Sequence, residues 1–107
     1  MKKMIYTYKE ILEMVAEAND ISIDDVSFTF KHDFGYSCAQ ATYIVLPQKS
    51  EINIPKKVYK AIGVTDFNFM NFEHSTRWGR YIIKIWNVDR TISERLHREQ
   101  EEYESGD

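Results

Sequence analysis

Two residues of types that carry chemistry lie close together in the N-terminal half of the chain. His32 and Cys38 flank a short turn segment, so they could face each other across a hairpin. A thiolate nucleophile needs such a histidine as its base and a third group, here Asp33, to orient that base. The alternative is a half-buried cysteine in an apolar strand beside a surface histidine. No signature of a cysteine-dependent enzyme accompanies these residues, so we expect no catalytic residues.

Metal and cofactor patterns are also missing from the sequence. The residues His32, Cys38, His74 and His97 are scattered, without the close-set pairs that metal sites usually have. Neither a phosphate-binding loop nor a dinucleotide fingerprint occurs. We therefore expect a protein that is not an enzyme and that holds no metal or cofactor.

Length and composition indicate one domain with its own core. The chain has 107 residues, of which 43% are hydrophobic and 14% aromatic, well above the composition of a disordered chain. The single cysteine excludes an internal disulfide and fits a reducing compartment. No stretch approaches the ~20 apolar residues of a membrane helix, and no signal-peptide pattern opens the chain. We expect a cytoplasmic protein with no membrane contact.

Hydrophobic periodicity in the first half predicts a helix followed by a hairpin. Thr7 and Glu10 form a capping box before an apolar stripe, which predicts a helix over 8–18 that ends at Asn19 and Asp20. Alternating apolar residues then predict a strand over 24–31. A turn that contains Gly35 leads to the expected returning strand over 37–46.

The second half of the chain predicts more strands around a short helix. Residues 51–54 alternate like a short strand, and the following residues 55–62 are expected to form a helix that Gly63 closes. Residues 65–73 alternate with a slip of one position, which suggests a β-bulge. Residues 80–88 are apolar on both faces, as in a central strand.

A final helix and an acidic end complete the expected fold. Asp89 or Thr91 caps this helix, and Ile92, Leu96 and Tyr103 are expected to face inward. Residues 100–107 are expected to fray as an acidic tail. The prediction is a single α+β domain over 1–107, with an antiparallel sheet of four to five strands, an N-terminal helix packed on one face of that sheet, a short central helix and a C-terminal helix.

Charge is divided unevenly along the chain, although the net charge is only −3. Residues 1–46 hold four lysines against seven acidic residues, a net charge of −3. Residues 47–88 hold seven basic residues against three acidic ones, a net charge of +4. Residues 89–107 hold three arginines against seven acidic residues, a net charge of −4. Local charge influences partner choice more than the total does, so the basic middle is a candidate binding segment.

Residues 52–64, Ile-Asn-Ile-Pro-Lys-Lys-Val-Tyr-Lys-Ala-Ile-Gly-Val, resemble the signature of the AbrB/MazE swapped-hairpin family. The resemblance covers residues 48–86. It implies an intertwined homodimer that binds DNA through basic residues, here Lys49, Lys56, Lys57 and Lys60, with salt-dependent affinity. The sequence departs from the family pattern in its long N-terminal extension and in Glu51, which would repel phosphate.

Aromatic residues of the second half allow two interpretations. Phe67, Phe69, Phe72, Tyr81 and Trp86 could stack bases, but at strand spacing such residues more often belong to the core. Another tryptophan precedes Gly79 in an expected turn, where an exposed ring could anchor a partner. The predicted partner-binding residues are Lys49, Lys56, Lys57, Lys60, Arg77, Trp78 and Arg80.

These observations favour a small non-enzymatic binding protein. The first hypothesis is a regulator or inhibitor that occupies the surface of a protein or nucleoprotein partner, of the kind that phages and mobile elements encode. The abundance of Lys, Ile, Tyr, Asn and Glu, typical of AT-rich genes, agrees with that source. The second hypothesis is an AbrB/MazE-like DNA-binding transcriptional regulator or antitoxin, as a homodimer. A third possibility is that the acidic C-terminal helix imitates nucleic acid.

Overall fold

A capped amphipathic helix, α1 (Tyr8–Asn19), begins the fold. The computed structural model describes residues 5–31, 40–47, 51–65, 69–75 and 79–105. The Thr7 hydroxyl accepts a hydrogen bond from the Glu10 N–H at 3.1 Å, and the Glu10 carboxylate accepts one from the Thr7 N–H at 2.9 Å. This confirms the predicted capping box. The helix ends at Asp20, whose φ of 54° is left-handed.

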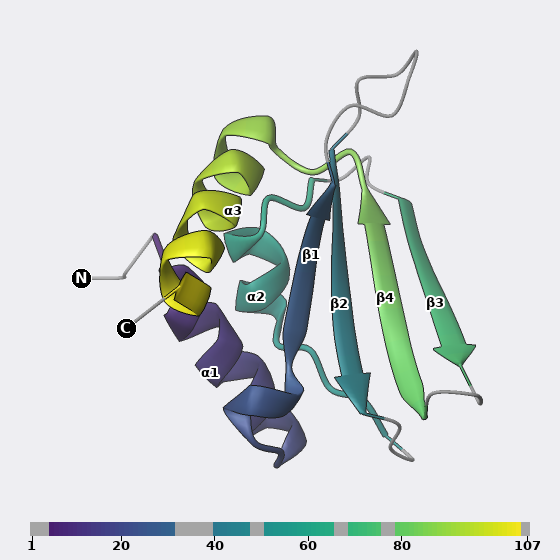
Figure 1. Ribbon diagram of the computed structural model, residues 1–107. Coiled ribbons are helices and arrows are strands. Elements are labelled where there is room, and N and C mark those ends of the chain that lie inside the picture. The colour runs from purple at the N-terminus through teal and green to yellow at the C-terminus, as the bar shows by residue number, and fades with distance from the viewer. Residues whose placement is uncertain (1–4, 32–39, 48–50, 66–68, 76–78, 106–107) are drawn as a thin grey trace.

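Four antiparallel strands form one sheet in the order β1-β2-β4-β3 (Figure 1). They are β1 (Ser27–Lys31), β2 (Ala41–Pro47), β3 (Phe69–Ser75) and β4 (Arg80–Trp86). The predicted α+β fold with an antiparallel sheet is confirmed. Strand β1 starts later than predicted because Ile23–Asp25 forms a short 3-10 turn, η1, whose Asp24 N–H is bound by the Ser22 side chain.

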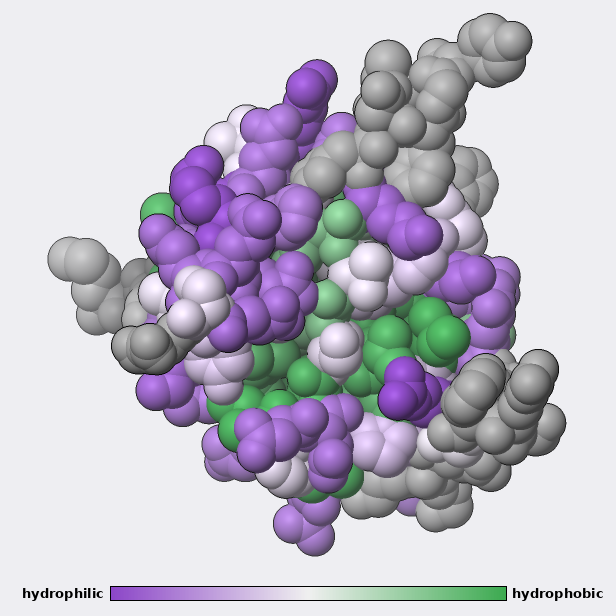
Figure 2. Space-filling view, in the orientation of Figure 1, coloured by the Kyte–Doolittle hydropathy of each residue, from purple (hydrophilic) through white to green (hydrophobic). Residues whose placement is uncertain are grey.

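The three α-helices of the described residues lie on one face of the sheet, as Figure 1 shows for α1, α2 (Lys56–Ala61) and α3 (Arg90–Ser105). The core fills the space between the helices and this face. Its most deeply buried members come from both layers and include Ile11, Val15, Ile44, Val58, Ile62, Ile83, Ile85 and Leu96. In the same orientation, Figure 2 shows apolar residues gathered in the middle of the view, over the strands, with the hydrophilic atoms of α3 beside them.

The predicted strand over 51–54 is wrong. Residues 51–55 form neither a strand nor a helix. The buried side chain of Asn19 binds this segment: its Oδ1 accepts from the Asn53 N–H at 2.7 Å, and its Nδ2 donates to the Asn53 carbonyl at 2.8 Å. A side chain of α1 therefore takes the hydrogen bonds that a neighbouring strand would otherwise make. Ile52 and Ile54 pack against the core.

The predicted bulge in the third strand is also wrong. Strand β3 pairs with β4 in continuous register from Phe69 opposite Trp86 to Ser75 opposite Arg80. The strand was predicted to begin at Thr65, but Thr65 is not part of it. Residues 66–68 lie outside the described residues. From residue 69 onward the alternation is regular, because Met70 and Phe72 lie opposite Ile85 and Ile83 and share their face of the sheet. Phe72 was expected in the core but is 58% exposed.

Helix α3 extends through Ser105 and so includes most of the segment that was expected to fray. The Asp89 carboxylate accepts from the Ile92 N–H at 3.0 Å and begins the helix. Leu96 is fully buried, whereas Tyr103, which was expected to face inward, is 42% exposed. The buried Gln100 amide donates to the Phe28 carbonyl of β1 and to the Tyr8 hydroxyl of α1, which holds the end of α3 in place.

Ile82 and Ile83 are neighbours on β4 whose side chains point to opposite faces of the sheet, so replacing each in turn tests which face the helices cover. We expect Ile83→Ala to lower the free energy of unfolding by about 2–5 kcal/mol, because Ile83 is fully buried under the helices. Ile82→Ala removes the same atoms from the opposite face, where Ile82 is only half-buried, and should cost clearly less. Urea unfolding of both variants measures the difference. Equal losses would contradict a helix layer on one face only.

Candidate functional site

The residues considered for catalysis and metal binding do not form a site that the structure describes. His32, Asp33 and Cys38 lie outside the described residues, and so does the expected turn around Gly35. His97 is half-buried on α3, with its ring 6.0 Å from that of Phe30. Within the described ranges, no group of three or more His, Cys, Asp and Glu residues could hold a metal ion.

The predicted partner-binding residues fall on different sides of the molecule. Lys56, Lys57 and Lys60 are exposed on α2, in the helix layer. Arg80 is exposed at the start of β4, where it lies opposite Pro47 of β2 and on the face away from the helices. The other three predicted residues, Lys49, Arg77 and Trp78, lie outside the described residues. The described basic residues of segment 47–88 therefore lie on two separate surfaces, one on α2 and one on the face of the sheet away from the helices.

The face of the sheet away from the helices is the larger of these surfaces, and we call it the open face. In antiparallel strands, residues directly opposite each other point to the same side. The register therefore assigns to this face the side chains that alternate with the core residues. Those with described side chains are Ser27, Thr29, Lys31, Ala41, Tyr43, Val45, Pro47, Asn71, Glu73, Arg80, Ile82, Lys84 and Trp86.

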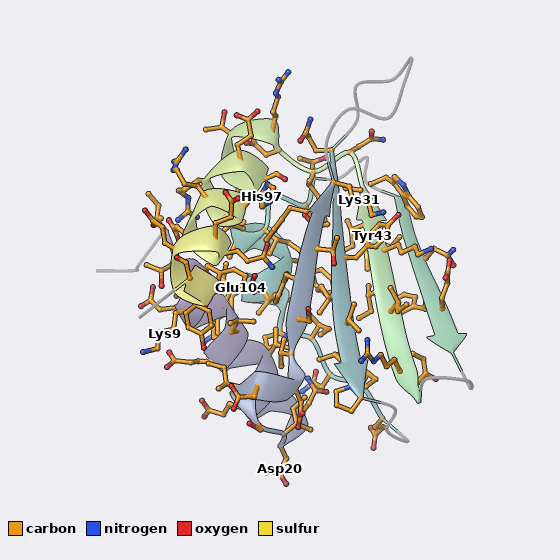
Figure 3. The ribbon with its side chains drawn as sticks, viewed as in Figure 1. Lys9, Asp20, Lys31, Tyr43, His97 and Glu104 are labelled. Atoms are coloured by element: carbon orange, nitrogen blue, oxygen red, sulfur yellow. The ribbon has the colours of Figure 1, made fainter. Side chains whose placement is uncertain are left out.

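An aromatic and basic cluster occupies one end of the open face, where β1 and β4 end. The ammonium group of Lys31 lies 5.2 Å from the Tyr43 ring centroid, and that of Lys84 lies 5.1 Å from the same centroid. Figure 3 labels Lys31 and Tyr43 on the neighbouring strands β1 and β2. The Trp86 ring meets the Tyr43 ring edge-on, with centroids 6.3 Å apart. Cation–π and edge contacts of this kind hold the side chains in a defined arrangement before any partner arrives.

An ion pair continues this cluster toward the β3 edge. The Lys84 ammonium lies 2.8 Å from the Glu73 carboxylate, and the Asn71 amide donates weakly to the same carboxylate at 3.4 Å. The hydrogen bond to Glu73 raises the pKa of Lys84 above its ordinary value of 10.5, against a smaller opposing effect of burial. Lys84 therefore stays charged on the open face throughout the neutral range.

The large apolar side chains on the open face are only half-buried, although the small Ala41 is fully buried. Val45 lies opposite Ile82, and both side chains, like those of Tyr43 and Trp86, have intermediate exposure. They are shielded by their neighbours in the sheet, and none of the helices in the described ranges lies over them (Figure 1). A sheet face with apolar side chains on its central strands and polar side chains on its outer strands is a common site of association between proteins.

The opposite end of the open face is hollowed by a polar cavity of about 400 Å³. Its lining includes Asp24, Asp25, Pro47 and Arg80. Pockets for small organic ligands are usually lined mostly by apolar side chains, with few polar groups. A lining that includes two aspartates and an arginine instead suits a polar side chain of a larger partner.

Sequence reasoning found Arg80 but missed the rest of the open face. Trp86 was expected in the core more than on a base-stacking surface, because aromatic residues at strand spacing usually belong to the core. Lys84 lies two residues from both Ile82 and Trp86 and therefore shares their face of the strand. Because a lysine is rarely buried, it could have indicated that this face is exposed. The partners Lys31 and Tyr43 come from other strands and depend on the register.

Comparison with known proteins gives no assignment. No protein-family model matches this chain, and neither the curated proteins nor the solved structures that were searched provide a match. The resemblance to the AbrB/MazE family therefore stays a prediction. None of the helices in the described ranges is long and apolar enough to cross a membrane.

The ion pair between Lys84 and Glu73 is lost in alkaline solution when Lys84 loses its proton, and the raised pKa of Lys84 moves this loss to higher pH. A raised folded-state pKa means that the ion pair stabilises the fold fully below about 10.5 and loses its contribution as the pH rises through the folded-state value. We expect Glu73→Gln to cost less than about 1 kcal/mol near neutral pH, and this difference from wild type to shrink in alkaline solution.

A matched control replaces the carboxylate of a pair whose cation does not titrate. Glu94 pairs with Arg90 at 3.0 Å on α3, and arginine keeps its proton in this range. The difference between wild type and Glu94→Gln should therefore persist at high pH. Denaturant unfolding across the alkaline range measures both differences. The same pH response in both variants would contradict a special environment for Lys84.

Proposed function

We propose that this protein is a non-catalytic binding protein that acts as a regulator or inhibitor by laying its open face against a protein partner. The observation that carries the proposal is the row of half-buried aromatic and aliphatic side chains on the sheet face that no described helix covers. Burying such side chains against another molecule is favourable, at roughly 25 cal/mol per Å² of apolar surface.

The composition of the open face suits a protein interface. Tyrosine, tryptophan and arginine are the residues that most often contribute binding energy at the centre of interfaces, and Tyr43, Trp86 and Arg80 lie on this face. Tyr43 and Trp86 are already ordered by their mutual contact and by the lysines beside Tyr43. Ordering before binding lowers the entropy that the complex must lose.

Charge on the strands of the open face points to an acidic region of the partner. Lys31, Arg80 and Lys84 are the basic strand residues of this face among those with described side chains, and Glu73 is the acidic one, whereas Asp24 and Asp25 lie beside the strands at the cavity. Glu73 is already paired with Lys84. Complementary charge at the edge of an interface speeds association and excludes partners of the wrong sign more than it adds affinity.

A second candidate function is DNA binding through α2. Lys56, Lys57 and Lys60 are exposed on this short helix, and no carboxylate of the described residues lies within ion-pair distance of them. Three such lysines could contact phosphates, which gives an affinity that falls steeply with salt. This surface faces away from the open face, so variants can separate the two functions.

Matched double variants test the protein-binding proposal. We expect a partner captured from an extract of the natural source cells by the immobilised wild-type protein to bind Lys31→Glu with Tyr43→Ser at least about tenfold more weakly. The control, Lys57→Glu with Tyr103→Ser, makes the same chemical changes on the helix side. Titration of the purified partner against each variant measures the affinities. Equal affinities for the two double variants would contradict the proposal.

Salt-dependent titration against duplex DNA tests the alternative. Under the protein-binding proposal we expect no measurable DNA affinity even at low salt. Affinity that falls steeply as salt rises, and that Lys56→Glu with Lys57→Glu abolishes, would replace that proposal with the DNA-binding function. Lys31→Glu with Lys84→Glu provides the matched control, because it reverses two lysines on the open face.

A further inference from the structure

The two edges of the sheet differ in how they are protected. Strand β1 forms one edge, and α3 runs beside it (Figure 1). The Gln100 amide of α3 binds the Phe28 carbonyl, so an acceptor of the β1 edge is already used. Strand β3 forms the other edge, pairs only with β4, and has no further strand beside it among the described residues. An edge with free backbone groups is a template for another strand.

The sequence of β3 lacks the features that usually block edge pairing. The segment Phe69–Ser75 contains no proline, lysine or arginine, and its one acidic residue, Glu73, is paired with Lys84. It has seven residues, as many as β2 and β4 and more than β1. Nothing in its described side chains therefore opposes the approach of a second strand.

Exposed apolar side chains lie along the same edge. Met70 is 39% exposed and Phe72 is 58% exposed, although both point to the helix-covered side of the sheet. The helix layer covers their neighbours on β4, Ile85 and Ile83, which are fully buried. The two exposed residues thus form an apolar strip that continues the core past the end of the helix layer.

We propose that β3 pairs antiparallel with β3 of a second copy of this chain, in a register centred on Phe72. The strand has Phe72 as its middle residue, so this register uses its full length. It brings the two Phe72 side chains opposite each other and places Asn71 of each copy opposite Glu73 of the other. Aromatic pairs and amide–carboxylate pairs are favourable across strands, and no like charges meet.

The symmetry of this pattern is the reason for choosing a second copy as the occupant. A two-fold interface needs a surface that is complementary to itself, with residue i against j and j against i. The described side chains of β3 meet this condition about Phe72, since the single carboxylate on the strand faces an amide and not its own copy. A strand from an unrelated protein would require no such symmetry.

The resulting dimer has a continuous sheet of eight strands. A two-fold axis perpendicular to the sheet at Phe72 puts both helix layers on one side and both open faces on the other. The strips of Met70 and Phe72 then bury each other between the helix layers. The pairing does not depend on the proposed function, because it is tested by the state of association of the protein alone.

The first experiment measures association across a wide range of protein concentration by sedimentation velocity. We expect the wild-type protein to form dimers and Phe72→Lys to raise the dissociation constant at least about tenfold, since two lysines would then oppose each other. Tyr103→Lys is the matched control, as it changes an apolar residue of similar exposure on α3 and should dimerise like wild type. Circular dichroism confirms that each variant is folded.

A second experiment identifies the edge without relying on a destabilising change. In a Cys38→Ser background, Phe72→Cys should give a covalent dimer with a short bis-maleimide crosslinker, because this residue would lie opposite its own copy. Tyr103→Cys in the same background should stay monomeric after treatment. A wild-type protein that is monomeric at all concentrations, a dimer unaffected by Phe72→Lys, or crosslinking through Tyr103→Cys alone would each overturn the proposal.

Discussion

The packing of α1, α2 and α3 on one face of the sheet is the constraint on which the rest of the described structure depends. Strand residues alternate between two faces, so one set enters the core and the other points away from it. The side chains of Ile44, Ile83 and Ile85 point to the covered face and are fully buried there. No described helix is left for the opposite face, and the aromatic and basic cluster around Tyr43 has no helix over it as a consequence.

Polar contacts between distant residues keep the helices in this layer. Asn19 of α1 binds the backbone of Asn53 and so fixes the segment that enters α2. At the far end of α2, Gly63 has a φ of 94°, and a Cβ there would lie 2.9 Å from the backbone nitrogen of Asp89. The Asp89 N–H donates to the Gly63 carbonyl at 2.9 Å, which joins the end of α2 to the start of α3. These contacts hold the α2 lysines on the side away from the open face.

Local patterns predicted most of the fold because they depend on neighbours in sequence. The capping box at Thr7 and the alternation of Phe28 with its neighbours needed no tertiary information. Residues 51–54 alternate as a strand does, but the side chain that binds them comes from α1 and cannot be identified from local sequence. Likewise, the sequence shows that β4 is apolar on both faces but not which face the helices cover. The open face could therefore not be located before the register was known.

The most direct test of the open face as the binding surface is side-chain footprinting of the protein with and without its captured partner. Hydroxyl radicals label exposed aromatic and aliphatic side chains, so labelling falls where a partner covers them. We predict that Tyr43, Ile82 and Trp86 lose labelling in the complex, whereas Tyr59 and Tyr103 on the helix side keep theirs. Protection confined to Tyr59 or Tyr103, with Tyr43 and Trp86 unchanged, would contradict the account.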